Sequence, residues 1–333
     1  MTALPLVIVT SSSDYPVDVA TVAETLRGKA QYRVIDLPHR TLSAAEEDDL
    51  IAKFKGVPAV FVRPGIITRR VIEACLDLRI IAVHGAGVDQ VDVAAATDAG
   101  VVVTNVPGGN ANAVAELAFG LMLSLVRRIP QSSWIVQHEG KWDEGRLLGD
   151  ELRGKTLGVV GCGHVGRRVI GFAQAFEMSV LAYDPLISGD GIQAMGAKPV
   201  DLATLLQSVD VLTLHVPLMD KTRHLIGASQ LASMKKGALV INTSRGPIVD
   251  EAALFAALQS GHLGGAALDV MEKEPPAADN PLRGLPNVIL TAHIAGSTHQ
   301  VLTVLAKTCC EEIVRVLQGE RPLHPVNPAV LLA

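Results

Sequence analysis

The sequence predicts an α/β protein made of two domains, each a doubly wound parallel sheet. The chain has 333 residues, and at roughly 150 residues per domain this length suggests two domains. Hydrophobic residues make up 49% of the chain but aromatic residues only 3%. Small aliphatic side chains suit buried parallel strands under closely packed helices. Strand-like apolar runs also alternate with helical stretches from the first residues onward, which is typical of this class.

Five strand–helix units are expected in the first hundred residues. Ser43 and Glu46 have the spacing of a capping box, so a helix is expected from there through Phe54. A second helix is expected over Val17–Leu26. The expected strands are Leu6–Val9, Arg33–Asp36, Ala59–Val62, Ile80–Val83 and Val101–Thr104.

A second series of alternating elements begins near Thr156. Before it, a long helix is expected over Ala113–Arg128, bounded by Pro107 and Pro130, and a polar stretch containing two tryptophans follows. The expected strands of this series are Leu157–Val160, Val180–Tyr183, Val211–Leu214, Leu239–Asn242, Gly265–Asp269 and Val288–Leu290. A last helix is expected over His299–Leu317.

A glycine-rich turn follows the first strand of this second series. Gly161 permits a tight turn, Gly163 lets a pyrophosphate approach the backbone, and Gly166 allows close helix–strand packing. Asp184 ends the next strand, where its carboxylate would bind ribose hydroxyls and repel a 2′-phosphate. No Arg or Lys follows it closely, so NAD is favoured over NADP. S-adenosylmethionine and FAD remain alternatives for this turn.

Three polar side chains follow later strands of the same series. Arg245, Glu274 and His293 would meet at the carboxyl edge of the sheet, where ligands bind in such folds. An Arg can orient a carboxylate with two hydrogen bonds, a His can exchange a proton near neutral pH, and an acid can hold the His ring. Glu272 competes with Glu274 for the last role.

Several motifs in order make the sequence similar to the D-isomer-specific 2-hydroxyacid dehydrogenase family. The resemblance runs from Val60-Phe-Val-Arg63 through Gly85-Ala-Gly87-Val-Asp89 and Val114-Ala-Glu116 to the glycine turn and the triad segments. It implies a flavodoxin-like substrate domain, residues 1–104 with 300–333, and a Rossmann NAD-binding domain, residues 105–299, with a cleft between them. It also implies hydride transfer between NAD(H) and a D-2-hydroxy or 2-oxo acid.

The resemblance also implies a role for individual residues. His293 would be the acid/base, Glu274 would pair with it, and Arg245 would bind the substrate carboxylate. Arg63 and the loop Gly85, Ala86 and Gly87 would contact substrate from the other domain. The residues expected to contact the cofactor are Gly161, Gly163, His164, Val165, Gly166, Asp184, His215, Val216, Thr243, Ser244, Arg245, Asp269, His293 and Gly296.

Two departures from the family leave the substrate open. His164 occupies a position where many relatives have Arg. Val83 occupies another position where phosphoglycerate dehydrogenases often have Arg. The substrate could be of the 3-phosphoglycerate, hydroxypyruvate or glyoxylate type. Two alternatives are an NAD(H)-sensing, corepressor-like binding protein and a formate or phosphite dehydrogenase of the same fold.

Composition argues against several classes of binding partner. A net charge of −5 gives no basic field for nucleic acid or an anionic membrane, and the first residues do not resemble a signal peptide. No His/Cys spacing indicates a metal site, and four cysteines without a CxxC motif suit a reduced cytoplasm. We expect a homodimer, with the helix Val114–Val126 either in the interface or in the core. No regulatory domain is expected after Pro325.

Overall fold

The computed structural model describes residues 3–142 and 145–332. The chain divides into two compact units. The first combines Met1–Asn110 with Ser297–Ala333, and the second is Ala111–Gly296. These boundaries lie within a few residues of the expected 104/105 and 299/300.

The first unit has a five-stranded parallel sheet, in agreement with the predicted fold class. Its strand order is β2-β1-β3-β4-β5, the flavodoxin-like order. The strands are β1 (Leu6–Ser11), β2 (Gln31–Asp36), β3 (Ala59–Val62), β4 (Ile80–Val83) and β5 (Val102–Thr104). The helices are α1 (Val19–Leu26), α2 (Ala44–Phe54), α3 (Arg69–Ala74), α4 (Val93–Asp98) and α12 (His299–Leu317), with the 3-10 helix η5 (Pro328–Leu332) near the C-terminus.

Local sequence signals begin and end several of these elements. The predicted capping box is confirmed, because Ser43 accepts from the amide of Glu46 while the Glu46 carboxylate accepts from the amide of Ser43 at 2.8 Å. Strands β3 and β4 are buried along their whole length, so they read as continuous apolar runs rather than alternating ones. Helix α12 packs against both strands although it is far away in sequence.

The second unit has a seven-stranded parallel sheet in the order β12-β11-β10-β9-β6-β7-β8. The strands are β6 (Thr156–Val160), β7 (Ser179–Tyr183), β8 (Lys198–Pro199), β9 (Val211–Leu214), β10 (Leu239–Asn242), β11 (Gly265–Leu268) and β12 (Val288–Leu290). The two-residue strand β8 is too short to give a sequence pattern and was not predicted. The strand order reverses between β6 and β9, as in a Rossmann sheet.

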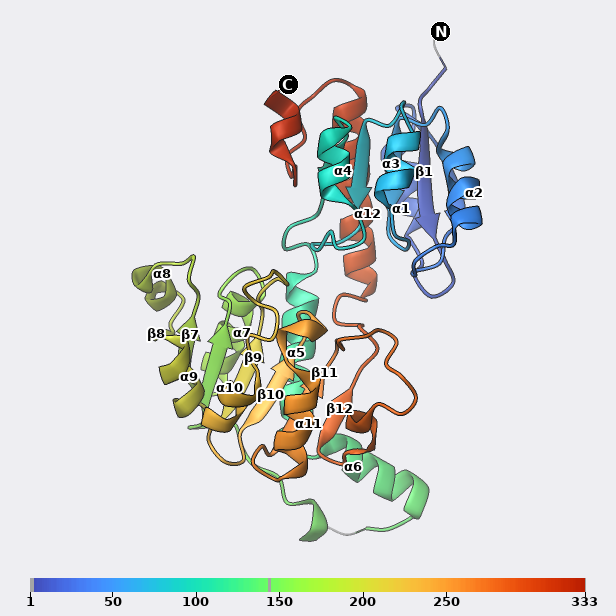
Figure 1. Ribbon diagram of the computed structural model, residues 1–333. Coiled ribbons are helices and arrows are strands. Elements are labelled where there is room, and N and C mark those ends of the chain that lie inside the picture. Colours follow the sequence, from blue (N-terminus) through green and yellow to red (C-terminus); the bar gives the residue numbers. More distant parts are fainter. Residues whose placement is uncertain (1–2, 143–144, 333) are drawn as a thin grey trace. The chain divides into compact units, whose positions relative to one another are not determined.

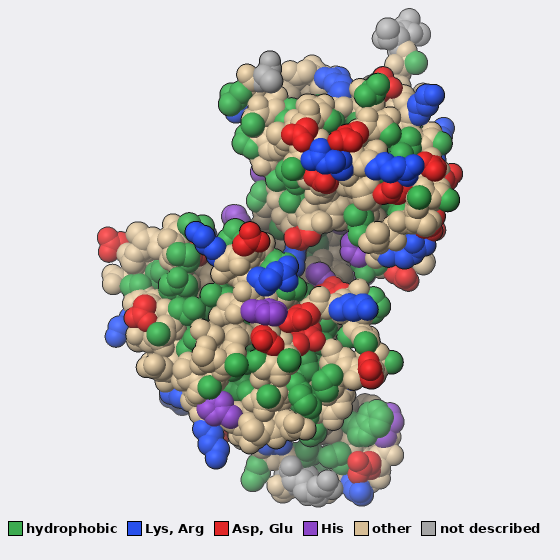
Figure 2. Space-filling view, viewed as in Figure 1, with side chains coloured by type: hydrophobic (Ala, Val, Ile, Leu, Met, Phe, Trp, Pro, Cys, Tyr) green, Lys and Arg blue, Asp and Glu red, His purple; other side chains and the backbone are tan. Residues whose placement is uncertain are grey.

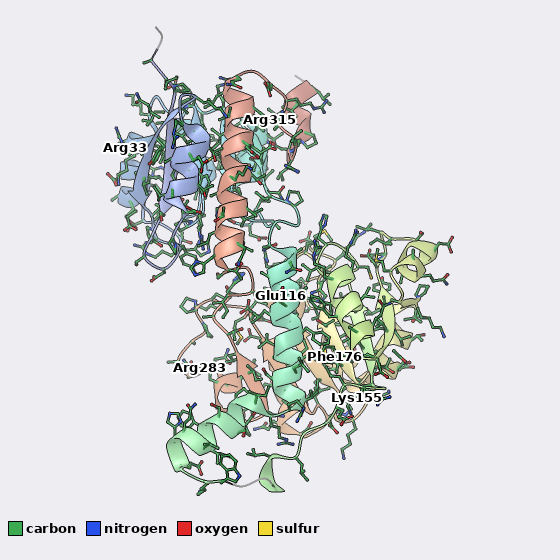
Figure 3. The ribbon with its side chains drawn as sticks, turned by 180° about the vertical axis from the view of Figure 1, so that it is seen from behind. Arg33, Glu116, Lys155, Phe176, Arg283 and Arg315 are labelled. Carbon is green, nitrogen blue, oxygen red and sulfur yellow. The ribbon has the colours of Figure 1, made fainter. Side chains whose placement is uncertain are left out.

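Helices cover this second sheet (Figure 1). They are α5 (Ala111–Val126), α6 (Ile129–Trp134), α7 (Gly166–Ala175), α8 (Gly189–Ala194), α9 (Leu202–Ser208), α10 (Ala228–Ser233) and α11 (Glu251–Gln259), with the short helices η1 (Ile135–Glu139), η2 (Gly145–Leu147), η3 (Gly246–Ile248) and η4 (Pro281–Gly284). Figure 3 shows α5 beside α7, where the Phe119 ring lies 5.9 Å from Phe172 and 4.8 Å from Phe176. Most of α5 is buried, so it belongs to the core.

The polar stretch after α5 is helical, which was not predicted. Arg128 takes a left-handed conformation after the end of α5, so it separates α5 from α6. Pro130 then lies in the first turn of α6. A proline is tolerated there because the first-turn amides have no partner within the helix. Helices α6 and η1 contain no buried residue and extend from the unit as an arm, residues 129–139 (Figure 1).

The surface of the first unit carries both signs of charge close together (Figure 2). Arg69 pairs with Glu73 and Asp98, and Arg70 pairs with Glu47 and Asp48, so this basic pair belongs to a solvated helix face. Across residues 3–142 and 145–332, no helix is long and apolar enough to cross a membrane. In the same residues no three His, Cys, Asp or Glu side chains are grouped to hold a metal ion. A cytoplasmic location stays a prediction.

Candidate active site

Three loops meet at the carboxyl edge of the seven-stranded sheet. Strands β10, β11 and β12 are neighbours, and each ends in a segment that the sequence singled out. Arg245 follows β10, Glu274 lies in the loop after β11, and His293 follows β12. The parallel register of the strands therefore brings the three side chains to one edge.

His293 and Glu274 are in direct contact. Nδ1 of His293 lies 2.7 Å from Oε2 of Glu274, and the other carboxylate oxygen accepts from the amide of Met271 at 3.0 Å. The hydrogen bond to Glu274 raises the pKa of His293, against the opposing effects of burial and of the Arg245 charge. Burial raises the pKa of Glu274, but the His293 contact and the Met271 amide outweigh it, so the net shift is downward. The pair therefore favours a protonated imidazole and an ionised acid.

Asp269 holds the backbone of His293 in an uncommon conformation. His293 has a φ of 53°, in the left-handed region that non-glycine residues rarely adopt. Its amide donates to the carbonyl of Asp269 at 2.8 Å, and the buried Asp269 carboxylate accepts from the amides of Ile294 and Ala295 at 2.9 and 2.8 Å. Thr291 adds a hydroxyl bond at 2.6 Å. Asp269 thus shapes the loop that presents the imidazole.

The Arg245 loop packs tightly against the Glu274 loop. A Cβ on Gly246 would lie 1.9 Å from the backbone of Met271, so only glycine fits there. Asn242 fixes the same turn, because its amide group donates to the Arg245 carbonyl at 2.9 Å and its oxygen accepts from Ser244. The guanidinium donates to the Ser244 carbonyl at 2.8 Å. Its charge acts on both members of the His293–Glu274 pair.

Glu272 does not contact His293. Its carboxylate accepts from Nε2 of His224 at 2.8 Å instead. The sequence left open which of the two acids faces the histidine, and the geometry places Glu274 there.

The glycine turn after β6 has the shape of a phosphate-binding loop. Gly161 has a φ of 93°, and a Cβ on it would lie 2.6 Å from the His215 carbonyl oxygen. A Cβ on Gly166 would lie 2.0 Å from the Gly161 carbonyl, at the start of α7. A Cβ on Gly163 would meet nothing within 4 Å. The first and third glycines are thus required by packing, while the second faces space that a dinucleotide pyrophosphate can fill.

Further predicted cofactor residues surround this turn. His164 is exposed, and Val165 precedes α7. The Asp184 carboxylate accepts from the amides of Cys162 and Leu186, both at 2.8 Å, so it is held beside the turn. Burial and this carboxylate raise the pKa of the Cys162 thiol to about 12, so the thiol stays protonated.

Two buried polar atoms, in His215 and Thr243, lie just after the neighbouring strands β9 and β10, where a bound cofactor could provide hydrogen-bond partners. His215 follows β9, and its Nε2 lies 2.9 Å from the Thr213 hydroxyl; burial lowers the pKa of this histidine to about 3. In the part of the chain that the structure describes, its Nδ1 and the hydroxyl of Thr243 are buried without a hydrogen-bond partner. Val216 and Gly296 are half-buried at the same edge.

The predicted substrate residues of the first unit follow β3 and β4. The carbonyls of Gly85 and Ala86 accept from Val106 at 2.8 Å and Asn105 at 2.6 Å, which fixes the loop. Among the described residues, the amides of Ala86 and Gly87 have no hydrogen-bond acceptor. Such a pair of free amides suits a carboxylate.

Arg63 lies beside His84 at this edge. Val62 and Val83 are register partners, and the His84 amide donates to the Val62 carbonyl at 2.8 Å. Nη1 of Arg63 and Nε2 of His84 are buried and have no hydrogen-bond partner among the described residues. Burial and the Arg63 charge lower the pKa of His84 to about 3, so the imidazole is neutral. In the sequence His84 adjoins the Gly85 loop, where a lone histidine gives no decisive signal for a functional role.

Comparison with known proteins gives one consistent family. The family model described as "D-isomer specific 2-hydroxyacid dehydrogenase, NAD binding domain" matches residues 119–295. The chain is 46% identical over 281 residues, 84% of its length, to D-3-phosphoglycerate dehydrogenase of Archaeoglobus fulgidus, of which this covers 53%. It is 40% identical over 275 residues, 82% of its length, to hydroxypyruvate reductase of Thermotoga maritima, covering 89% of that protein.

The solved structures agree with this result. The crystal structure of D-lactate dehydrogenase from Aquifex aeolicus, complexed with NAD and lactic acid, matches with a TM-score of 0.82 and 29% identity, covering 96% of this chain and 99% of that one. The chain spans about half the length of the phosphoglycerate dehydrogenases it matches. The predicted family and fold are confirmed: the chain belongs to the D-isomer specific 2-hydroxyacid dehydrogenase family and contains its NAD-binding domain.

Proposed function

We propose that the chain is an NAD-dependent oxidoreductase that transfers hydride between NAD(H) and a small D-2-hydroxy acid or its 2-oxo acid. The substrate is of the 3-phosphoglycerate, hydroxypyruvate or glyoxylate type. The Glu274–His293 contact of 2.7 Å, at the edge where Arg245 also lies, is the observation that supports this most directly. Relatives named hydroxypyruvate reductase and glyoxylate reductase are 40% identical to the chain.

The bound nicotinamide would supply or accept the hydride, and the protein residues handle the proton. Because Nδ1 of His293 is committed to Glu274, Nε2 is the atom that exchanges a proton with the substrate oxygen. The raised pKa keeps His293 able to donate during reduction of the 2-oxo acid, while oxidation needs the neutral ring. Arg245 binds the substrate carboxylate through its planar guanidinium.

The first unit would serve as the substrate domain. The free amides of Ala86 and Gly87 support this role, since backbone N–H groups bind a carboxylate without adding a counter-charge. Arg63 adds a cation beside them. The second unit would hold the cofactor.

A substrate panel followed at the NADH absorbance tests the proposal. Glyoxylate, hydroxypyruvate and pyruvate would be offered with NADH, and 3-phosphoglycerate, formate and phosphite with NAD. We expect turnover of at least one 2-oxo or 2-hydroxy acid, with a product of D configuration where hydroxypyruvate or pyruvate is reduced. Tight NADH binding without turnover would favour an NAD(H)-sensing binding protein, and oxidation of formate or phosphite alone would favour that reaction class.

We infer that the cofactor is NAD rather than NADP. The Asp184 carboxylate is fixed beside the glycine turn by two amides, so it can bind ribose hydroxyls but not a 2′-phosphate. The expected result is a kcat/KM for NADH well above that for NADPH. Asp184→Ser should reduce this ratio, whereas an unchanged ratio would contradict the assignment.

We also propose a homodimer joined through the arm rather than through α5. Helix α5 is a core element, whereas large apolar side chains of the arm and the residues after it are exposed. They are Ile129, Trp134, Val136, Trp142 and Leu148. Such a concentration of apolar surface is typical of an interface. Sedimentation should show a dimer that dissociates in Trp134→Ser/Trp142→Ser, and a monomeric wild type would overturn this proposal.

A further inference from the structure

A second carboxylate–imidazole pair lies at the sheet edge that carries the proposed acid/base pair. Nε2 of His224 is 2.8 Å from Oε1 of Glu272. Glu272 stands only two residues before Glu274, so both acids belong to one short loop after β11. The proposed reaction uses Glu274 and assigns nothing to this second pair.

Glu272 ties this loop to the first turn of α11. Its carboxylate accepts from the amide of Glu251 at 3.2 Å, and its own amide donates to the Glu251 carboxylate. The other oxygen of Glu251 accepts from Asn280 at 3.0 Å. The loop is therefore fastened at Glu272 by both its backbone and its side chain.

The backbone of His224 is held in a strained conformation while its ring contacts Glu272. His224 has a φ of 49°, a left-handed value that glycine adopts without cost. Its amide donates to the carbonyl of Pro247, at 2.7 Å, in the turn that follows Arg245. Strain of this kind persists only where the surrounding contacts determine it. His224 thus links the Arg245 turn, through its backbone amide, to the Glu272 loop, through its ring.

Any displacement of Glu272 would reach the proposed catalytic residues. A Cβ on Gly246 would lie 2.4 Å from the Glu272 amide nitrogen, so the Arg245 turn leaves no room for this peptide to move inward. The adjoining amide of Met271 is the donor that fixes Oε1 of Glu274 at 3.0 Å.

We propose that Glu272 is a positioning residue that, together with His224, holds Glu274 in contact with His293. This inference rests on the proposed function, because it assumes that His293 exchanges the proton. If Glu274 were held less firmly against Nδ1 of His293, its carboxylate would stabilise the protonated ring less well. The high-pH limb of the reductive kcat/KM profile would then move to lower pH.

Three variants test this role: Glu272→Gln, His224→Gly and the double variant. His224→Gly removes the ring and also relieves the backbone, so it should fold. At pH 8 we expect kcat/KM to fall roughly tenfold in Glu272→Gln, below the 10²-fold loss that a 1 Å misplacement can cause. His224→Gly should fall by less, because Glu272 keeps its bond from Glu251. The double variant should lose no more than Glu272→Gln, since the residues act as one unit.

Asp279→Asn is the matched control, because it removes an exposed carboxylate from the same loop region. It should leave the pH profile unchanged. NADH affinity and melting temperature should stay near wild type in Glu272→Gln, which separates positioning from unfolding. An unshifted limb in Glu272→Gln would overturn the inference while leaving the proposed function standing. A wild-type enzyme without turnover would fail the proposed function instead.

Discussion

The carboxyl edges of the two sheets differ in how their polar side chains are satisfied. In the seven-stranded sheet, Glu274 and His293 bond each other and Arg245 bonds a neighbouring carbonyl. In the five-stranded sheet, buried nitrogens of Arg63 and His84 have no partner among the described residues. Contacts within the protein therefore satisfy the proposed acid/base pair at the first edge, although Nδ1 of His215 and the Thr243 hydroxyl there have no partner among the described residues. The second edge keeps buried nitrogens available for an anionic ligand.

The two edges also differ in how they respond to pH. The pKa of His293 is raised by its carboxylate partner, while burial and a neighbouring cation lower the pKa of His84 to about 3. Around neutral pH, the His293–Glu274 pair can therefore change its charge, whereas His84 stays neutral. The pH dependence of turnover should thus come from the seven-stranded sheet and that of stability in mild acid partly from the five-stranded sheet.

The largest expected effect tests the first edge. His293→Ala removes the group that donates the proton, so kcat should fall by about 10²–10⁴-fold. NADH binding should survive, because the glycine turn and Asp184 belong to other loops. Steady-state rates and NADH fluorescence titration measure the two effects. The exposed His299 offers a control, and turnover near the wild-type level in His293→Ala would remove His293 from the mechanism.

A second variant examines the pairing within that edge. Glu274→Gln keeps the shape but removes the charge that raises the pKa of His293. Reduction needs the protonated ring and is lost as pH rises through this pKa, so the loss should begin at lower pH in the variant. Oxidation needs the neutral ring, and its low-pH limb should shift in the same direction. Profiles of kcat/KM in both directions check this, and two unshifted limbs would exclude the carboxylate as the cause.

Sequence motifs located the proposed catalytic residues of the seven-stranded sheet more fully than the polar residues at the edge of the five-stranded sheet. Arg245, Glu274 and His293 each follow a strand, and neighbouring parallel strands bring such residues to one edge. The choice of Glu274 over Glu272 could not be made from spacing, because it depends on how the loop folds back. The glycine turn could be predicted from the sequence because close backbone packing requires glycine at two of its positions, Gly161 and Gly166.

Other features gave no sequence signal because they are set by tertiary contacts. The strand β8 has only two residues, and the arm was hidden by Pro130, which begins a helix here rather than ending one. The link between His224 and Glu272 joins residues 48 positions apart. The burial of His84 and its unpartnered Nε2 could not be predicted from its place beside the Gly85 loop.

A moderate effect is expected at the carboxyl edge of the five-stranded sheet. Arg63→Gln removes a half-buried cation whose Nη1 has no hydrogen-bond partner among the described residues, so the folded chain should tolerate the change. If Arg63 contacts substrate, KM should rise by roughly tenfold to a hundredfold, with little change in kcat. This factor corresponds to the binding free energy that one charged hydrogen bond contributes. Arg69→Gln, which breaks only surface ion pairs, is the control. An unchanged KM for every accepted substrate would assign Arg63 to the structure alone.

The smallest effect concerns stability rather than turnover. His84→Leu replaces a buried imidazole that has an unpartnered nitrogen by an apolar side chain, so the melting temperature at pH 7 should hold or rise. The sign in acid follows from linkage. The folded pKa is about 3 against an ordinary 6.5, so the unfolded chain binds more protons between these values and stability falls as pH drops below 6.5.

At pH 5 this single histidine should cost about 2 kcal/mol of unfolding free energy relative to pH 7. His84→Leu should recover that amount, and denaturant unfolding at pH 7 and pH 5 measures it. His215 also has a pKa lowered to about 3, so part of the acid sensitivity should remain in the variant. A variant that loses as much stability as wild type between the two pH values would mean that His84 is charged or accessible in the folded chain. The contrast between a neutral His84 and a readily protonated His293 would then fail.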